Sequence, residues 1–206
     1  MSDSPVSWPD VLRPGRFYPG LDPLAATGGK AAVSGRVKNN AAPTLGIWRP
    51  VYGDILIWTA AQRSALAEFE VKVLGRDRPI NVPYLHAGIG PFVAGAATVT
   101  SVAADADAGD TSLSITKTAA GTLGAGHAFS IGTHLYKVHA VTAQDGASAT
   151  VDIVPELRAD IAAGATIRFD NPIVKCRLVD PRALSPDFDQ AYKARITLQF
   201  IEDTTP

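Results

Sequence analysis

The side chains best suited to metal binding or acid–base chemistry are four histidines, His86, His127, His134 and His139. A metal site needs three or four converging ligands, commonly spaced i, i+4 on a helix or i, i+2 on a strand. His134 and His139 are five positions apart, which places them on opposite faces of a continuous strand. We therefore expect no metal site and no cofactor, and we interpret the histidines as surface or core residues.

Nucleophilic hydrolysis has no suitable residues either. It requires a Gly-x-Ser-x-Gly turn, or a cysteine beside a base, and neither pattern is present. The single cysteine, Cys176, alternates with Val174 and Leu178, a pattern typical of a buried and unreactive thiol. One thiol forms neither an internal disulfide nor a thiolate zinc cluster, which fits folding in a reducing cytoplasm.

Paired carboxylates could serve a glycosidase, and the sequence offers Asp187 with Asp189, and the group Asp105, Asp107 and Asp110. Both sets lie in turn-like contexts, where aspartate caps nearby backbone N–H groups. The second set also lacks the glycine and the terminal glutamate that a calcium-binding EF-hand loop requires. We interpret both sets as turns.

Glycines and aromatic residues offer two further kinds of ligand site. The glycines Gly121, Gly124 and Gly126 are not followed by the Lys-Ser/Thr of a phosphate-binding loop, and strand-like residues come next, so turns are expected. Aromatic rings could stack on a sugar, although core packing or subunit contacts explain them equally well. These residues are Trp48, Tyr52, Trp58 and Tyr84. The sequence therefore predicts a protein that is not an enzyme.

Composition limits the remaining classes of function. The chain has 206 residues, 46% of them hydrophobic, which is enough for one large or two small domains with a real core. It carries 19 Lys and Arg against 20 Asp and Glu, so no tight binding of nucleic acid is expected. The first nine residues lack the pattern of a secretion signal, and no long apolar run occurs, so neither export by that route nor membrane insertion is expected.

The first thirty residues are rich in proline and glycine, which excludes a regular helix and predicts an extended arm. Its aromatic residues Trp8, Phe17 and Tyr18 are more than a freely solvated tail usually contains. We therefore expect the arm to dock, and we take these three residues as candidates for a subunit interface.

One helix is predicted, over residues 60–74. Thr59 and Gln62 have the spacing of a capping box at its start. Leu66, Phe69 and Val73 fall on one stripe and are expected to pack on the core.

Strands are expected where apolar and polar residues alternate. Outside the middle of the chain, these segments are 31–38, 44–51, 54–58, 78–85, 174–178 and 194–200. Tyr52 and Gly53 are expected to interrupt the second and third of them, and Pro79 and Pro83 favour a sheet edge for the fourth. The first and last thirds of the chain are then expected to share one sheet.

The composition of the middle of the chain differs from that of its flanks. Residues 96–169 consist largely of Ala, Gly, Thr, Ser, Val and Asp, in short alternating runs separated by turns. A tight hairpin is predicted around Gly132 and Thr133, and one helical turn over residues 157–161. We interpret residues 96–169 as an autonomous, inserted small all-β domain, and residues 1–95 with 170–206 as the core. The predicted fold class is mainly β with one packed α-helix.

The order of these pieces resembles the distal tail proteins of long-tailed bacteriophages. The resemblance covers roughly residues 1–95 and 170–206, and it rests on Trp58-Thr59-Ala60-Ala61-Gln62, Pro79-Ile80-Asn81-Val82-Pro83 and the closing strand from Ala194 to Glu202. It implies a β-sandwich or split-barrel core with one packed helix, six copies joined in a ring, and a second domain that projects outward. The family has no catalytic residues to transfer.

The resemblance also implies a function. The protein would be a virion structural protein of the baseplate or tail tip, made in the host cytoplasm. Its hexameric ring would join the tail tube protein to the tail hub protein and let DNA pass. An alternative is a carbohydrate-binding module, in which the inserted domain holds a host surface glycan. An enzyme is the third possibility, and it has the least support from the residues.

Overall fold

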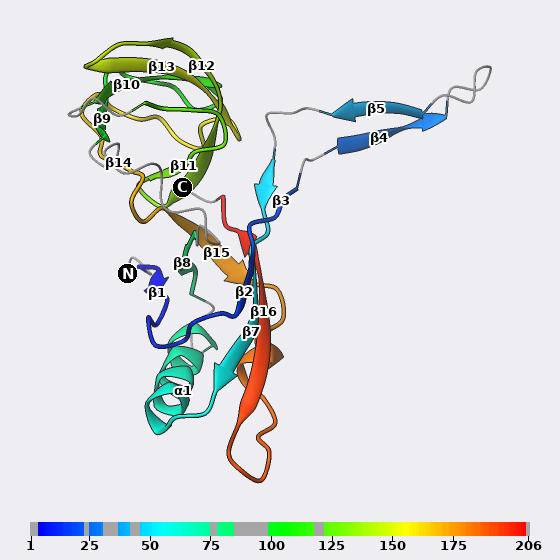
Figure 1. Cartoon of the computed structure of the whole chain (residues 1–206). Helices are drawn as coiled ribbons and strands as arrows, with labels where there is room; N and C mark the ends of the chain where they lie inside the picture. Colours follow the sequence, from blue (N-terminus) through cyan, green and yellow to red (C-terminus); the bar gives the residue numbers. More distant parts are fainter. Residues whose placement is uncertain are drawn as a thin grey trace.

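The computed structural model describes residues 4–22, 25–30, 37–41, 46–74, 78–84, 99–117 and 122–204. Within these ranges the chain is mainly β with one α-helix, as the sequence predicts (Figure 1). The described strands form two six-stranded sheets and two small ribbons. Most of the predicted strand 31–38 lies outside the described residues.

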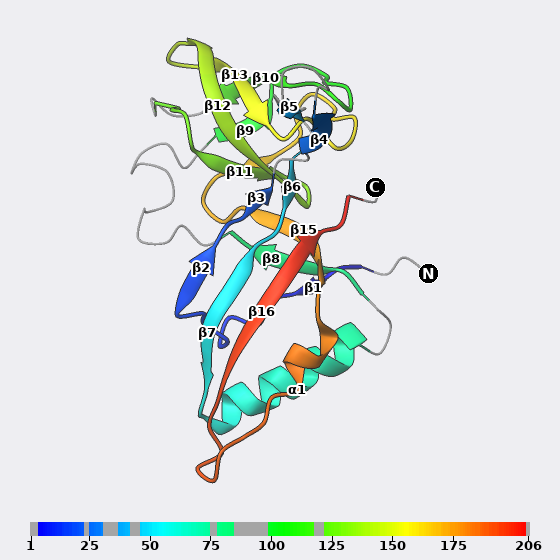
Figure 2. The same ribbon diagram turned by 90° about the vertical axis from the view of Figure 1, so that its right-hand side faces the viewer.

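The core sheet joins strands from both ends of the chain, as predicted. In spatial order its strands are β1 (Val6–Ser7), β8 (Ile80–Pro83), β15 (Ile173–Leu178), β16 (Ala194–Glu202), β7 (Val51–Ile57) and β2 (Arg16–Tyr18). β15 and β16 pair through their ends, Cys176–Leu178 with Phe200–Glu202. The sheet turns a corner there, so its two halves run in different directions around the core (Figure 2).

Two details of the predicted strands are wrong. β7 continues through the expected break at Tyr52 and Gly53, because the Tyr52 ring is fully buried and its hydroxyl donates to the Pro83 carbonyl. β8 does not lie at the sheet edge, because β1 pairs with it in parallel, starting at Val6. Pro79 precedes β8 and Pro83 ends it, so neither proline removes a donor from the middle of the strand.

Helix α1 (Ala60–Leu74) covers one side of the core sheet (Figure 2). The Gln62 backbone N–H donates to Thr59 Oγ1 at 3.2 Å, and the Thr59 backbone N–H donates to Gln62 Oε1 at 3.1 Å. This reciprocal pair is the capping box expected from the spacing of the two residues. A short 3₁₀ helix, η1 (Pro181–Leu184), follows β15 and contacts α1.

The buried side of α1 is the stripe expected from the sequence. Its buried side chains are Leu66, Phe69 and Val73, and all three belong to the hydrophobic cluster of the core. The Phe69 ring meets the Trp8 ring edge-on at 5.4 Å. The helix is therefore held to the core by apolar contacts with both the sheet and the N-terminal segment.

The N-terminal segment packs into the core of its own chain. Trp8 is 8% exposed, and its ring also meets the Tyr52 and Phe200 rings edge-on, at 4.8 and 6.0 Å. Its indole N–H donates to the carbonyl of Leu12, whose side chain is fully buried. Trp8 is thus a core residue, which corrects the expectation that it lies at a subunit interface.

The other two interface candidates lie on β2. Phe17 is partly buried, and its ring packs edge-on against Tyr52 and Tyr84 at 5.7 and 5.3 Å. Tyr18 is 55% exposed and leaves most of its ring available for a neighbour. The structure therefore separates the three candidates into a core residue, a partly covered residue and an exposed residue.

The second large sheet is formed within residues 96–169 and is nearly closed into a barrel. In spatial order its strands are β14 (Ile167–Arg168), β11 (Ala128–Ile131), β12 (His134–Gln144), β13 (Ser148–Val154), β10 (Ser112–Lys117) and β9 (Val99–Val102). The two ends of the sheet meet where the Val102 N–H donates to Ala165 O at 3.0 Å and the Gly164 N–H donates to Val102 O at 2.9 Å. The barrel encloses a hydrophobic cluster of its own.

Local predictions for the barrel are correct at one turn and wrong at another. Gly132, with φ of +59°, makes the tight β11–β12 turn that its sequence predicts. The predicted helical turn at 157–161 is absent from this described segment, because Ile161 forms a strand-like bridge with Ala106 while Leu157 enters the barrel core.

Two ribbons lead away from the core. β3 (Leu21–Asp22) pairs with β6 (Ile47–Trp48), and beyond them β4 (Ala25–Lys30) pairs with β5 (Val37–Ala41). Figure 1 shows the β4–β5 ribbon standing away from both the core and the barrel. From here on, this projecting ribbon of β4 and β5 is called the arm, and the name no longer refers to the first thirty residues.

Candidate functional site

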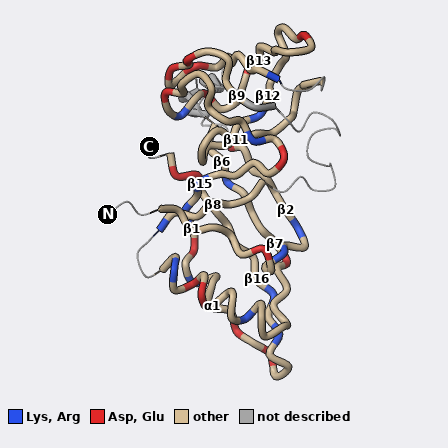
Figure 3. Tube along the Cα trace, turned by 90° about the vertical axis from the view of Figure 1, so that its left-hand side faces the viewer, with Lys and Arg blue, Asp and Glu red and all other residues tan. Residues whose placement is uncertain are grey.

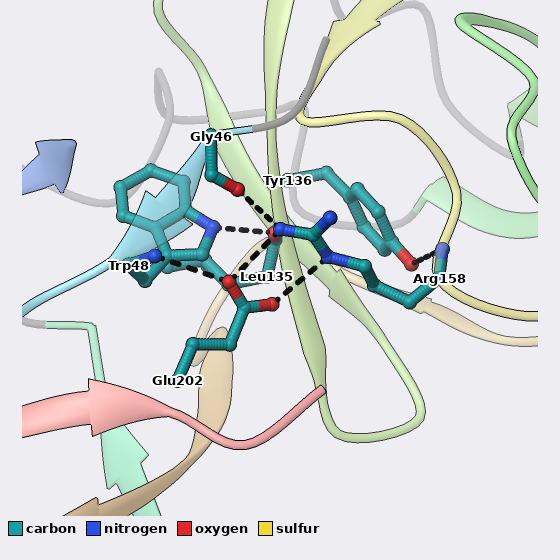
Figure 4. Close-up of polar contacts among 6 residues, drawn as sticks. All are labelled: Gly46, Trp48, Leu135, Tyr136, Arg158 and Glu202. Atoms are coloured by element: carbon teal, nitrogen blue, oxygen red, sulfur yellow. Dashed lines mark hydrogen bonds and ion pairs between the residues drawn. The ribbon is translucent and has the colours of Figure 1, made fainter. Parts of the chain in front are cut away.

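A buried polar network joins the barrel to the core (Figure 4). Its centre is Arg158, in the segment after β13, and Glu202, the last residue of β16. Arg158 Nε donates to Glu202 Oε1 at 3.2 Å, and Arg158 Nη2 donates to Glu202 Oε2 at 3.1 Å. The Glu202 side chain is 0% exposed and that of Arg158 is 9% exposed. Both charges are therefore removed from water and compensate each other.

The remaining polar groups of this network also have partners (Figure 4). Arg158 Nη2 donates to the Gly46 carbonyl, and Glu202 Oε2 accepts the backbone N–H of Trp48 at 3.1 Å. The backbone N–H of Arg158 donates to the Tyr136 hydroxyl at 3.2 Å, and burial raises the pKa of Tyr136 to about 12. A buried ion pair is tolerated when its geometry is good and further hydrogen bonds support it, as those with Gly46 and Trp48 do here.

Trp48 forms a second link between the two units. Its ring is fully buried, and its indole N–H donates to the Leu135 carbonyl of the barrel at 2.8 Å. The Lys137 ammonium lies 5.4 Å from the ring centroids of both Trp48 and Tyr84, within the range of a cation–π interaction. The side chains of Leu135 and Ala128 belong to the hydrophobic cluster of the core, although their strands belong to the barrel.

The β11–β12 turn of the barrel lies against β15 of the core. The Lys175 backbone N–H donates to the Thr133 carbonyl at 2.8 Å, and the Ile173 N–H donates to Ser130 Oγ at 3.2 Å. His134 follows this turn directly and is 8% exposed. The barrel thus shares packing and polar contacts with the core, while it keeps a sheet and a hydrophobic cluster of its own, and its autonomous folding stays a prediction. These contacts are called the junction below.

Among the residues that the structure describes, those with possible catalytic chemistry are not brought together by the fold. His127 Nδ1 accepts the Gly124 N–H at 2.8 Å, while His139 is exposed on β12. Cys176 is fully buried, and burial together with the nearby carboxylates raises the pKa of its thiol. In the described ranges no three His, Cys, Asp or Glu side chains form a group able to hold a metal ion. His86 and Gly121 lie outside these ranges.

The aspartates proposed as possible acid–base pairs organise loops. Asp189 Oδ1 accepts the backbone N–H groups of Ala191 and Lys193, both at 2.8 Å. Asp105 and Asp110 accept backbone N–H groups of the barrel loops at 2.7 and 3.0 Å. These contacts agree with the turn interpretation and account for the position of the carboxylates without a substrate.

The aromatic residues offer little surface for a sugar. Trp48 and Tyr52 are fully buried, and of the four stacking candidates Trp58, on the core, is the most exposed, at 57%. The aromatic side chains of the barrel segment 96–169 are all buried in the barrel core. They are Phe129, Tyr136 and Phe169. The barrel therefore lacks an exposed ring of the kind on which carbohydrate modules stack sugars.

The two central residues of the junction, Arg158 and Glu202, were missed by sequence reasoning. A signal for Glu202 exists, because it falls in the inward phase of β16 together with Ile196, Leu198 and Phe200. A charged residue at an inward strand position requires a buried partner. Arg158 carries no such signal, since it lies 44 residues away in an irregular segment.

The fold and the junction define a class of protein: a mainly β chain with one packed helix and a nearly closed barrel fixed to its core. No protein-family model matches the sequence, and no curated protein matches it. Within the described part of the chain, no helix has the length and apolar character needed to cross a membrane.

Proposed function

We propose that the protein is a structural subunit of a long-tailed bacteriophage tail tip, a distal tail protein of the baseplate. Six copies, a number taken from the family resemblance, form a ring between the tail tube protein and the tail hub protein. The ring lets DNA pass without holding it. The order of elements resembling this family supports the proposal, as does the mainly β core with its packed helix.

The arm is the observation that carries the proposal. An isolated two-stranded ribbon is marginally stable in water, and its free edges tend to pair with another chain. Since the arm stands away from its own core and barrel (Figure 1), a neighbouring copy is the natural surface to cover it. The described strands that reach outward are then β4 and β5, so only the end of the proline-rich first thirty residues takes part.

The base of the arm is held firmly by the core and by the junction. β3 and β6 pair through Leu21 with Trp48, and Trp48 is anchored in the junction. At Gly20, with φ of +52°, a side chain would come within 2.2 Å of the Arg49 carbonyl, so glycine is required where the chain turns into this ribbon. A firmly held base favours contact of the arm with one particular neighbour, as a closed ring requires.

The distribution of charge fits a conduit for DNA. Figure 3 shows Lys and Arg interspersed with Asp and Glu over the core, and acidic residues gathered on barrel loops. These loops carry the exposed carboxylates of Asp105, Asp107, Asp110 and Asp160. Cationic contacts with phosphates add affinity by releasing counterions, so a mixed or acidic surface favours transit over retention.

Mass photometry tests the proposal. We expect full-length protein to form a particle of about six times the 21.6 kDa chain mass, with a ring shape in negative stain. Replacing residues 25–41 by a short Gly/Ser linker should give a monomer that still melts in one cooperative transition, because the arm stands away from the core (Figure 1). A Gly/Ser insertion at Gly146, a turn on the barrel, serves as the matched control and should leave the ring intact.

Two results would contradict the proposal. One is a full-length protein that stays monomeric at high concentration and in the presence of its tail tube and hub neighbours. The other is an armless variant that assembles as well as the full-length protein, since the arm would then have no part in the contact.

A further inference from the structure

His134 lies in the junction, at the point where the barrel contacts β15 of the core. Its side chain is 8% exposed, and the preceding residue, Thr133, accepts the backbone N–H of Lys175 from the core. The His134 Nδ1 atom is buried and has no hydrogen-bond partner among the described residues. A proton on this nitrogen would thus be buried without an acceptor, at the point where barrel and core touch.

Two cations face His134 from two different elements. Lys175 lies on β15, and Arg158 lies in the segment after β13. Burial and then these two positive charges lower the pKa of His134, while Asp203 opposes them in part. The neutral imidazole is therefore the form that fits the closed junction.

The two carboxylates near this cluster are each engaged with an arginine. Glu202 is paired with Arg158 at 3.1 Å, and Asp203 is paired with Arg177 at 3.1 Å. An imidazolium at His134 would therefore meet two nearby cations, and both nearby anions already have arginine partners. The added repulsion would act between the barrel and β15, across the contact itself.

We propose that the junction is an acid-sensitive latch, closed when His134 is neutral and loosened when His134 is protonated. In the open form the imidazole meets water and recovers an ordinary pKa of about 6.5. Because the closed form holds that pKa lower, the open form takes up the proton first as pH falls, and the closed form loses stability below about pH 6.5. This property belongs to the single chain and does not depend on the proposed ring.

Hydrogen exchange on the full-length chain tests the latch. We expect the protection of the Lys175 and Trp48 backbone amides, corrected for intrinsic rates, to fall several-fold from pH 7.5 to pH 5.0, because the open form takes up the proton first. His134→Gln, which cannot gain the proton, should show no such fall. His139→Gln changes an exposed histidine of the same strand and should behave as the unmodified chain does.

A second measurement keeps the test decisive if His134→Gln does not fold. The histidine side chains of the unmodified chain are titrated by NMR, and His134 should titrate below the ordinary histidine pKa of about 6.5, together with loss of junction protection. Three results would overturn the latch: His134 titrating at or above the ordinary histidine pKa of about 6.5, protection that stays constant down to pH 5.0, or an equal loss of protection in His134→Gln.

Discussion

Glu202 shows how single residues set the geometry of this protein. It accepts hydrogen bonds from the Arg158 guanidinium and from the Trp48 backbone, so one carboxylate links the barrel, the base of the arm and the core strand that carries it. Buried ion pairs often add little net stability compared with apolar residues of the same shape. We infer that the contribution of this pair is orientation, because its hydrogen bonds form in one placement of barrel on core.

Removing one partner of this pair should be costly. Arg158→Met should lower the free energy of unfolding by about 3–5 kcal/mol, because Glu202 would be left as an unpaired buried charge. Urea denaturation followed by circular dichroism measures the change. Arg168→Met, at an exposed position on β14, is the control and should change stability by less than about 0.5 kcal/mol. Equal losses in the two variants would argue against the network described here.

At the scale of elements, α1 depends on its buried stripe. Phe69→Ala should lower the free energy of unfolding by about 3–5 kcal/mol, because a fully buried aromatic ring in contact with Trp8 is lost. Lys72→Ala removes an exposed pair with Glu68, spaced i, i+4, and should cost less than about 1 kcal/mol. Thermal and urea unfolding of both variants measure the difference, and comparable losses would mean that the stripe does not face the core.

The elements that sequence predicts best are those with a strong local pattern. Residues close together in the sequence determine these elements. They are the capping box and apolar stripe of α1, the alternation of β15 and β16, and the turn at Gly132. The predictions from sequence are wrong where contacts between residues far apart in the chain determine the structure. Nothing near Trp8 shows that its ring will be covered by Tyr52 and Phe200, and the 157–161 segment is held extended by its bridge to Ala106.

The candidate site could not be predicted from the sequence for the same reason. Its charged pair, Arg158 and Glu202, joins segments 44 residues apart, and the closing strand that ends at Glu202 does not indicate which residue its carboxylate will meet. Only the inward phase of Glu202 on β16 indicated that a charge would be buried. The partner is fixed by the way the barrel sits on the core, which local patterns do not encode.

For the whole molecule, the junction should make barrel and core unfold together. We expect one transition in differential scanning calorimetry at neutral pH, with calorimetric and van 't Hoff enthalpies in agreement. Arg158→Met should lower the midpoint of this transition, because the polar link between the units that carry the two hydrophobic clusters is lost. Two transitions in the unmodified chain would show that the junction does not couple the units.

The order of strands along the chain also has a consequence for synthesis on the ribosome. β7 and β8 emerge early, but their partners β16 and β15 follow only after the entire barrel has been translated. At roughly 5–20 residues per second, the half-built core waits several seconds with apolar strands uncovered. The barrel strands all lie between Val99 and Arg168, so the barrel completes first. The barrel can therefore fold before the core sheet is complete. A nascent chain released before Ile173 would lack β15, and the edge of β8 that pairs with β15 would stay unpaired.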